Sequence, residues 1–314
     1  MAVALPVTLL TGFLGAGKTT LLNHIVTGAP NTRFCVVENE FGTVGVDNEL
    51  VDSNAAAVFS LNEGCVCCDV RDDLVALFER LIDERLAYDH VLIETSGLAN
   101  PGPVMRVIER MRGHFRLHGV VAVVDAGHAR LDRNANPTWT EQLANADLIV
   151  LNKVSSSSDV QGLAAELTQL NPVASQVQVD HARIDIESVL SLNNHDIERI
   201  PARSTHAHDR DVGSVVAQVD GHLDPVKLDA WLGALVRTRS MELMRMKGIL
   251  ALDGHDERFV FQAVRSQLDV QPGQHWGDDE RLTRIVFIGR GLNPLQLQSG
   301  LQACAATQTC PGAV

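Results

Sequence analysis

The sequence predicts an α/β protein: a doubly wound, mainly parallel sheet, followed by a second, smaller α+β domain. Three observations lead to this prediction. Over residues 1–200, short apolar runs rich in Val, Ile and Leu alternate with helical stretches, as in parallel strands covered on both faces. A glycine-rich loop joins the first strand to the first helix. After the polar segment 201–212 the alternation ends, and several strands follow one another between two helices.

The N-terminal elements follow from hydrophobic spacing. In the first helix, Leu21, Leu22 and Ile25 recur at helical intervals and share one face. The near-continuous apolar runs are expected as buried strands at Pro6–Leu10, Phe34–Val37, His90–Ile93, Gly119–Val124 and Asp147–Leu151. The stretches expected as helices are Thr20–Val26, Asp72–Leu86, Pro103–Met111 and Val160–Leu170.

The remainder of the chain has a different order of elements. We expect strands at Ser214–Val219, Met246–Leu252, Arg258–Val264 and Arg284–Ile288, and helices at Pro225–Arg237 and Pro294–Ala303. Strands placed between two helices favour an α+β arrangement. We therefore divide the chain into an N-terminal domain over residues 1–200, a linker over 201–212 and a C-terminal domain over 213–314.

Composition excludes several classes of protein. A chain of 314 residues with 45% hydrophobic and 21% charged residues is globular, and long enough for two cores. The net charge of −13 argues against a nucleic-acid partner, because an acidic surface repels phosphate. The apolar Met1–Leu10 run lacks the basic residues of a secretion signal, and no apolar run approaches the ~18 residues of a membrane span. We expect a cytoplasmic protein with reduced thiols, for which a homodimer remains open.

The segment Gly12-Phe-Leu-Gly-Ala-Gly-Lys-Thr19 matches the phosphate-binding P-loop pattern in full, with a strand before it and a helix after it. The glycines let backbone N–H groups turn toward phosphate oxygens, and the helix adds its positive end. Lys18 supplies charge for the β- and γ-phosphates, and the Thr19 hydroxyl is a ligand for Mg²⁺. The residues expected to contact nucleotide here are Gly12, Gly15, Ala16, Gly17, Lys18, Thr19 and Thr20.

An acidic residue follows a second buried strand, in His90-Val-Leu-Ile-Glu94-Thr-Ser-Gly97. Glu94 would organise the water shell of Mg²⁺ or the attacking water, and the Gly97 N–H would sense the γ-phosphate. The alternative is a glutamate that faces solvent at a strand end. With the P-loop, this pattern predicts a nucleotide hydrolase.

The sequence indicates less clearly whether the bound nucleotide carries guanine or adenine. Asn152 and Lys153 follow a buried strand, as in the Asn-Lys-x-Asp sequence that binds guanine, but Ser155 stands where the aspartate is expected. A charged hydrogen bond contributes about 1.5–3 kcal/mol, so its loss lowers guanine preference by about one to two powers of ten. We expect GTP as the nucleotide, with a weakened preference over ATP.

Three cysteines stand close together, at Cys65, Cys67 and Cys68. They are either small buried apolar residues, a redox group, or metal ligands. Metal binding is the best interpretation, because clustered thiolates favour soft ions such as Zn²⁺. Zinc takes four ligands, so the fourth would be Glu38, a histidine, water or a group from another protein. An open shell of this kind suits a site that releases its metal.

These motifs occur together and in order, and the set resembles the CobW-like GTPases, in particular the zinc-regulated GTPase metalloprotein activators. The resemblance rests on six segments, four in the N-terminal half and two in the C-terminal half. They are Gly12–Thr20, Glu38–Gly42, Cys65–Cys68 and Glu94–Gly97, then Arg245–Gly248 and Trp276–Asp278. It implies a GTP-dependent metallochaperone whose cysteines bind zinc and deliver it to client apo-metalloproteins.

The resemblance also implies roles for individual residues. Glu38–Asp47 would be the first switch, with Asp47 a candidate catalytic residue, and Glu94–Gly97 the second. Asn152 and Lys153 would contact guanine. The sequence departs from the family at two positions. Ser155 stands where the family usually has an aspartate, and Thr43 stands where relatives carry a glutamate that can bind metal.

Two other functions fit part of the pattern. A small-molecule kinase or ATPase with structural cysteines would prefer ATP, and Ser155 is the feature in its favour. A nucleotide-gated metal sensor would hydrolyse GTP slowly and pass no metal on. In each case the smaller C-terminal domain, in which we find no catalytic motif, would dock a partner.

Overall fold

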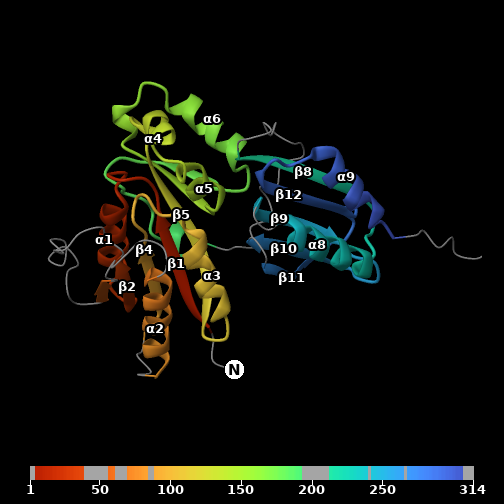
Figure 1. Cartoon of the computed structure of the whole chain (residues 1–314), viewed down its shortest axis with the longest axis horizontal. Helices are drawn as coiled ribbons and strands as arrows, with labels where there is room; N and C mark the ends of the chain where they lie inside the picture. Colours follow the sequence, from red (N-terminus) through yellow and green to blue (C-terminus); the bar gives the residue numbers. More distant parts are fainter. Residues whose placement is uncertain are drawn as a thin grey trace, which may run out of the picture. The chain divides into compact units, whose positions relative to one another are not determined.

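The computed structural model describes residues 4–38, 56–60, 69–83, 88–192, 212–239, 242–264 and 267–306 (Figure 1). The chain forms two compact units, Met1–Ala165 with Ala174–Asn194, and Glu166–Val173 with His195–Val314. Of the segment expected as a linker, 201–211 lies outside the described residues, and Val212 begins a strand.

The N-terminal unit contains a seven-stranded sheet in the order β3-β2-β4-β1-β5-β6-β7. Every neighbouring pair of strands runs parallel. The strands are β1 (Leu5–Thr11), β2 (Phe34–Glu38), β3 (Ala56–Ser60), β4 (His90–Glu94), β5 (Phe115–Asp125), β6 (Leu148–Asn152) and β7 (Ser175–Gln178). The predicted doubly wound parallel sheet is confirmed.

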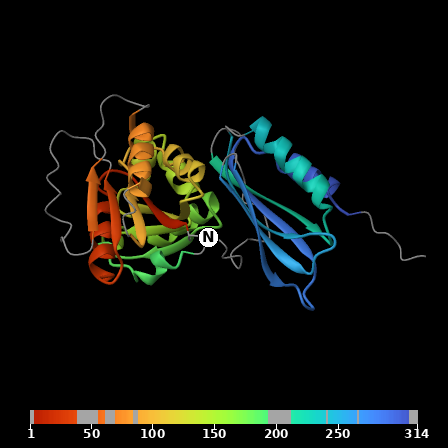
Figure 2. The ribbon, with the colours of Figure 1, turned by 90° about the horizontal axis from the view of Figure 1, so that it is seen from below.

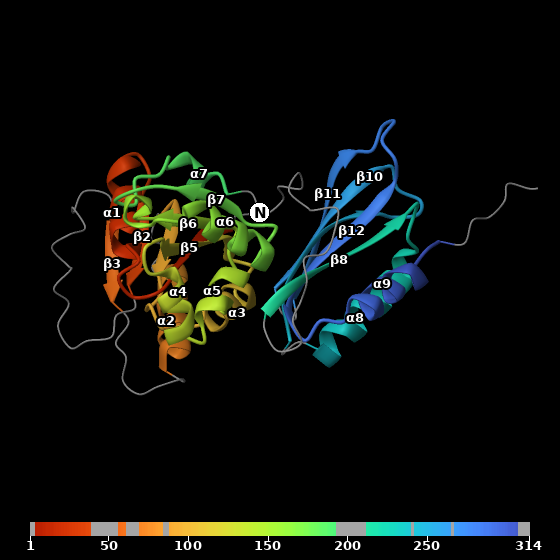
Figure 3. The ribbon, with the colours of Figure 1, turned by 90° about the horizontal axis from the view of Figure 1, so that it is seen from above.

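Helices cover both faces of this sheet (Figure 3). On one face, Leu21 and Ile25 of α1 pack into a core with Leu92 and Val121 of the strands. On the other, Phe78 of α2 stacks on Phe115 of β5, with ring centroids 4.1 Å apart. The helices are α1 (Lys18–Gly28), α2 (Asp69–Asp83), α3 (Gly102–Arg110), α4 (Ala129–Ala135), α5 (Trp139–Ala144), α6 (Val160–Leu170) and α7 (Glu187–Leu190).

Strand register brings the polar strand ends to one edge of the sheet. Glu94 at the end of β4 is paired with Leu10 of β1 on one side and with Glu38 of β2 on the other. Asp125 and Asn152 are paired at the ends of β5 and β6. In doubly wound sheets ligands bind beyond the carboxyl ends of the strands, so this edge is where a site is expected.

The second unit contains a five-stranded sheet in the order β11-β10-β9-β12-β8 with antiparallel pairing. Helices α8 and α9 lie on one face of it (Figure 2), over a core that includes Leu232, Phe261 and Phe287. The predicted smaller α+β domain is therefore confirmed. Its elements are β8 (Val212–Asp220), α8 (Pro225–Arg239), β9 (Leu243–Ala251), β10 (Glu257–Val264), β11 (Gln267–His275), β12 (Leu282–Arg290) and α9 (Pro294–Ala303).

Some elements were not predicted from the sequence: β3, β7, β11, α4, α5 and α7. The two edge strands β7, with the sequence SQVQ, and β11, with the sequence QLDVQPGQH, carry many polar residues, so their hydrophobic pattern is weak. Helices α4, α5 and α7 have seven residues or fewer, too short to show a period. Within the described ranges, no helix has the length and apolar character that crossing a bilayer requires.

Glu109, near the end of α3, gives the first unit a pH-dependent stability. Burial raises the pKa of this carboxyl to about 7, against an opposing effect of Arg106. The folded state therefore holds a proton that the unfolded chain releases above its ordinary pKa of 4.5. This contribution to stability is complete below pH 4.5 and is lost as the pH rises through about 7.

We predict that Glu109→Gln raises the free energy of unfolding at pH 8 by about 1–3 kcal/mol and leaves it unchanged near pH 4. Urea denaturation at a series of pH values measures the difference. Glu79→Gln, at an exposed position of α2, is the control for removing a charge alone. A Glu109→Gln curve that runs parallel to the wild-type curve at all pH values would contradict the prediction.

Candidate nucleotide-binding site

The loop between β1 and α1 is held in a conformation that glycine alone adopts easily. Gly12, Gly15 and Gly17 have φ values of 135°, 72° and 107°. A Cβ on Gly12 would lie 2.1 Å from the carbonyl oxygen of Val123, and one on Gly17 would lie 2.5 Å from Nδ2 of Asn152. The glycines are thus required both by backbone conformation and by the close approach of β5 and β6.

Lys18, the first residue of α1, is a buried cation at this loop. It is 7% exposed, and its Nζ donates to the Phe13 carbonyl oxygen at 3.2 Å. Burial lowers the pKa of Lys18, and the nearby Glu94 carboxylate partly opposes that effect. A buried ammonium group is stabilised by anions, so phosphate oxygens at the start of α1 would favour its charged form.

Thr19, in the first turn of α1, lies against Glu94, the last residue of β4. The Thr19 hydroxyl donates to Oε1 of Glu94 at 2.9 Å. Glu38, 8% exposed, ends β2 in register with Glu94, so two carboxylates stand on adjacent strand ends. Hydroxyl and carboxylate oxygens are the ligands of hard divalent cations, and this donor set suits Mg²⁺.

The segment after β4 lies directly against the phosphate loop. Thr95 donates to the Leu10 carbonyl oxygen from its N–H at 2.9 Å and from its hydroxyl at 3.1 Å. A Cβ on Gly97 would lie 2.5 Å from the backbone nitrogen of Leu14. The two loops therefore pack against each other through their backbones.

The ends of β5 and β6 hold the other side of the loop. Asn152 donates from Nδ2 to the Ala16 carbonyl oxygen at 2.9 Å. Lys153 donates from Nζ to the Gly15 carbonyl oxygen at 2.8 Å and to Oδ2 of Asp125 at 2.8 Å. Both side chains therefore hold the loop in place through its carbonyl oxygens.

The site includes two aspartates that the sequence interpretation did not identify. Asp125 accepts hydrogen bonds from Lys153 and from the Gly127 N–H. Burial raises the pKa of Asp125, but hydrogen bonds from Lys153 and His128 outweigh this, and the pKa lies below its ordinary value. Asp180, just after β7, accepts from Ser155. The available signal for Asp125 was its position directly after a buried strand; Asp180 had no local signal.

The remaining predicted residues divide into two groups. Ala16 is fully buried in the loop, and Thr20 is exposed in the first turn of α1. The other group lies outside the described residues and consists of Asp47, Thr43, Cys65, Cys67 and Cys68. Among the described residues there is no group of three or more His, Cys, Asp or Glu side chains arranged to hold a metal ion.

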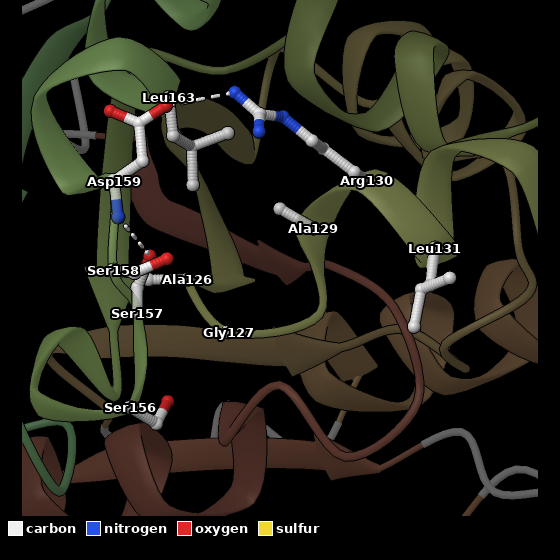
Figure 4. A pocket seen from close by; sticks show the side chains of 10 residues that line it. All are labelled: Ala126, Gly127, Ala129, Arg130, Leu131, Ser156, Ser157, Ser158, Asp159 and Leu163. Atoms are coloured by element: carbon white, nitrogen blue, oxygen red, sulfur yellow. Dashed lines mark hydrogen bonds and ion pairs between the residues drawn. The ribbon is translucent and has the colours of Figure 1, made fainter.

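A separate pocket of about 160 Å³ lies between the first turn of α4 and the loop before α6 (Figure 4). Arg130 and Asp159 form an ion pair at 3.0 Å there. The residues that line this pocket include none from the phosphate loop, Glu94, Asn152 or Lys153. The pocket is therefore separate from the glycine loop and from Lys18.

Comparison with known proteins agrees with this geometry. Residues 6–179 match the model of the CobW/HypB/UreG nucleotide-binding domain, and residues 212–305 match that of the cobalamin synthesis protein cobW C-terminal domain. The chain is 33% identical to the zinc chaperone YjiA of Escherichia coli over 296 residues, which cover 90% of this chain and 93% of YjiA.

Two further similarities extend over the whole chain. The zinc chaperone CobW of Pseudomonas aeruginosa is 32% identical over 348 residues, covering 96% of this chain and 92% of that protein. The crystal structure of Zn(II)-bound YjiA GTPase from E. coli aligns with a TM-score of 0.76 at 29% identity, covering 97% of this chain and all of that one.

We predict that Gly97→Ala disturbs the phosphate loop, because its methyl group would overlap the Leu14 backbone. The free energy of unfolding should fall by about 1–3 kcal/mol, and affinity for nucleoside triphosphate should fall with it. Gly113→Ala is the matched control, since a Cβ there meets no atom within 4 Å. Urea denaturation and nucleotide titration measure both effects, and equal behaviour of the two variants would refute the contact.

Proposed function

Because this chain belongs to the CobW/HypB/UreG family, we propose that it is a GTPase that binds zinc through Cys65, Cys67 and Cys68 and transfers it to client apo-metalloproteins. The observation that best supports the proposal is the Thr19–Glu94 hydrogen bond beside the phosphate loop. It places a P-loop hydroxyl and an acidic residue together, in a chain whose relatives are named zinc chaperones.

The nucleotide part of the proposal assigns a role to each group at the sheet edge. Phosphate and nucleotide contacts come from the loop residues Gly12, Gly15, Ala16, Gly17 and Thr20. The positive charge of Lys18 completes the phosphate site. Mg²⁺, held by Thr19 with Glu94 near its water shell, would neutralise charge on the phosphates. Glu94 would orient the attacking water, and Gly97 would sense the γ-phosphate through its N–H. Asp47, in the first switch, would assist catalysis.

The zinc part rests on chain connectivity. Ser60 ends β3 in register with Glu38, so the chain leaves the sheet at the nucleotide edge. Cys65 follows five residues later and is therefore within about 17 Å of Ser60. Cys68 directly precedes Asp69, the first residue of α2. The thiols are thus joined to the sheet on one side and to a helix on the other, with Glu38 a candidate fourth ligand.

This arrangement supports coupling between nucleotide and zinc. A γ-phosphate that orders the Glu38–Asp47 and Glu94–Gly97 segments would change the position of the strand ends from which the cysteine segment leaves. Hydrolysis would then relax the thiol site and release zinc to a client in the cytoplasm. A metal sensor would bind zinc without passing it to a client. A small-molecule kinase would transfer the γ-phosphate to an acceptor and would transfer no zinc.

We predict that Cys67→Ala lowers zinc affinity by more than about 100-fold, because a direct ligand matters at least as much as the groups that orient it. Zinc-stimulated GTP hydrolysis should be lost, while GTP affinity stays within about 2-fold. Competition with a chromogenic chelator measures the first effect, and phosphate release measures the second.

Cys304→Ala is the control for this experiment. Cys304 is a buried cysteine at the end of α9 in the C-terminal unit, far along the chain from the three candidate ligands. The Cys304→Ala variant should bind zinc with the affinity of the wild type. Unchanged zinc affinity in Cys67→Ala would remove the basis for the metallochaperone proposal and leave a nucleotide hydrolase of other function.

A further inference from the structure

Ser155, which replaces the expected aspartate of the base-binding sequence, is hydrogen bonded to another aspartate. Its backbone N–H donates to Oδ1 of Asp180 at 3.1 Å, and its hydroxyl donates to the same oxygen at 3.0 Å. Asp180 follows Ser155 by 25 residues, on the loop after β7. A carboxylate is therefore present where the sequence motif lacks one.

The backbone explains why these two loops meet. Strands β6 and β7 are parallel neighbours, and the Val179 N–H donates to the Leu151 carbonyl oxygen at 2.8 Å. Beyond Asp180, the Ala182 N–H donates to Oδ1 of Asn152 at 2.9 Å. Ala182 reaches this position through a left-handed turn, with a φ value of 53°. Asp180 is thus fixed between two residues that are anchored to the strand ending in Asn152.

The hydrogens of this pair are all accounted for. A carboxylate only accepts, so the single hydrogen of the Ser155 hydroxyl points to Asp180. Ser155 can then offer a ligand only the lone pairs of Oγ. Within the described parts of the chain, Oδ2 of Asp180 receives no hydrogen bond. The pair therefore presents two acceptors, one of them charged, and no side-chain donor.

We infer that Asp180, together with Ser155, is the residue that selects guanine, an inference that rests on the proposed GTPase function. The Watson–Crick edge of guanine offers two adjacent donors, N1–H and the 2-amino group, which match two acceptors. Adenine presents an acceptor at N1, which faces the carboxylate unfavourably. An acceptor-only pair thus binds guanine and rejects adenine, as a direct aspartate at position 155 would.

The test is a change of base preference. Asp180→Asn replaces Oδ2 by an amino group, which is a donor. The pair then offers one donor and one acceptor, which match the 2-carbonyl and N1–H of xanthine. We expect affinity for GDP to fall by about 10- to 100-fold and affinity for XDP to rise, so that XDP becomes the tighter ligand. Competition against a fluorescent nucleotide measures GDP, XDP and ADP on the full chain.

Two variants separate base recognition from loop structure. Asp185→Asn, at an exposed position of the same segment, removes an equal charge and should keep the wild-type order of affinities. The double variant Ser155→Asp with Asp180→Ser exchanges the two side chains and should restore preference for GDP over ADP. A rise in XDP affinity also shows that Asp180→Asn is folded.

Three outcomes decide the inference. A switch from GDP to XDP in Asp180→Asn, restored toward GDP in the exchanged variant, supports it. A wild type that prefers GDP, with an Asp180→Asn variant that keeps the same order, overturns it and leaves the proposed GTPase intact. A wild type that binds ADP as tightly as GDP overturns both this inference and the choice of GTP.

Discussion

The close approach of the phosphate loop to the end of β4 is the constraint on which the rest of the site depends. Gly97 lies so near Leu14 that a side chain at 97 would overlap backbone. The Thr19–Glu94 hydrogen bond crosses the same contact. Because β4 is flanked by β1 and β2, the contact joins the triphosphate site to the strand that ends at Glu38. The phosphate loop, Glu94 and Glu38 therefore lie at one edge of the sheet.

Charge at this edge is arranged for a complex of phosphate and metal. Buried Lys18 gains from anions, while the carboxylates of Glu38 and Glu94 gain from a cation. A nucleoside triphosphate bound with Mg²⁺ would supply both the anion that stabilises Lys18 and the cation that stabilises the two carboxylates. On the opposite side, Lys153 is held by Asp125 and by the loop carbonyl of Gly15. The position of Lys153 is thus set by the glycine loop, so a base contact from Lys153, as proposed, would depend on the conformation of that loop.

The sequence predicted the parts of the fold and site that local spacing encodes. The glycine loop, Lys18, Thr19 and the buried strand ending in Glu94 form continuous patterns, and the structure places them at one edge. Asp180 could not be found in this way, because its relation to Ser155 depends on pairing between β6 and β7, and β7 is a short polar strand. Asp125 was not identified either, and its only local signal is its place after a run of buried apolar residues. The roles of Cys65, Cys67 and Cys68 remain predictions, since these residues lie outside the described ranges.

We expect that filling the nucleotide site changes the zinc affinity of the cysteine cluster. Isothermal titration of Zn²⁺ into the full chain, loaded in turn with GDP, with a non-hydrolysable GTP analogue and with no nucleotide, tests it most directly. Coupling energies of about 1–3 kcal/mol correspond to affinity differences of about 5- to 150-fold. We expect a difference in that range between the GDP and GTP-analogue forms. The same zinc dissociation constant in all three forms would contradict it.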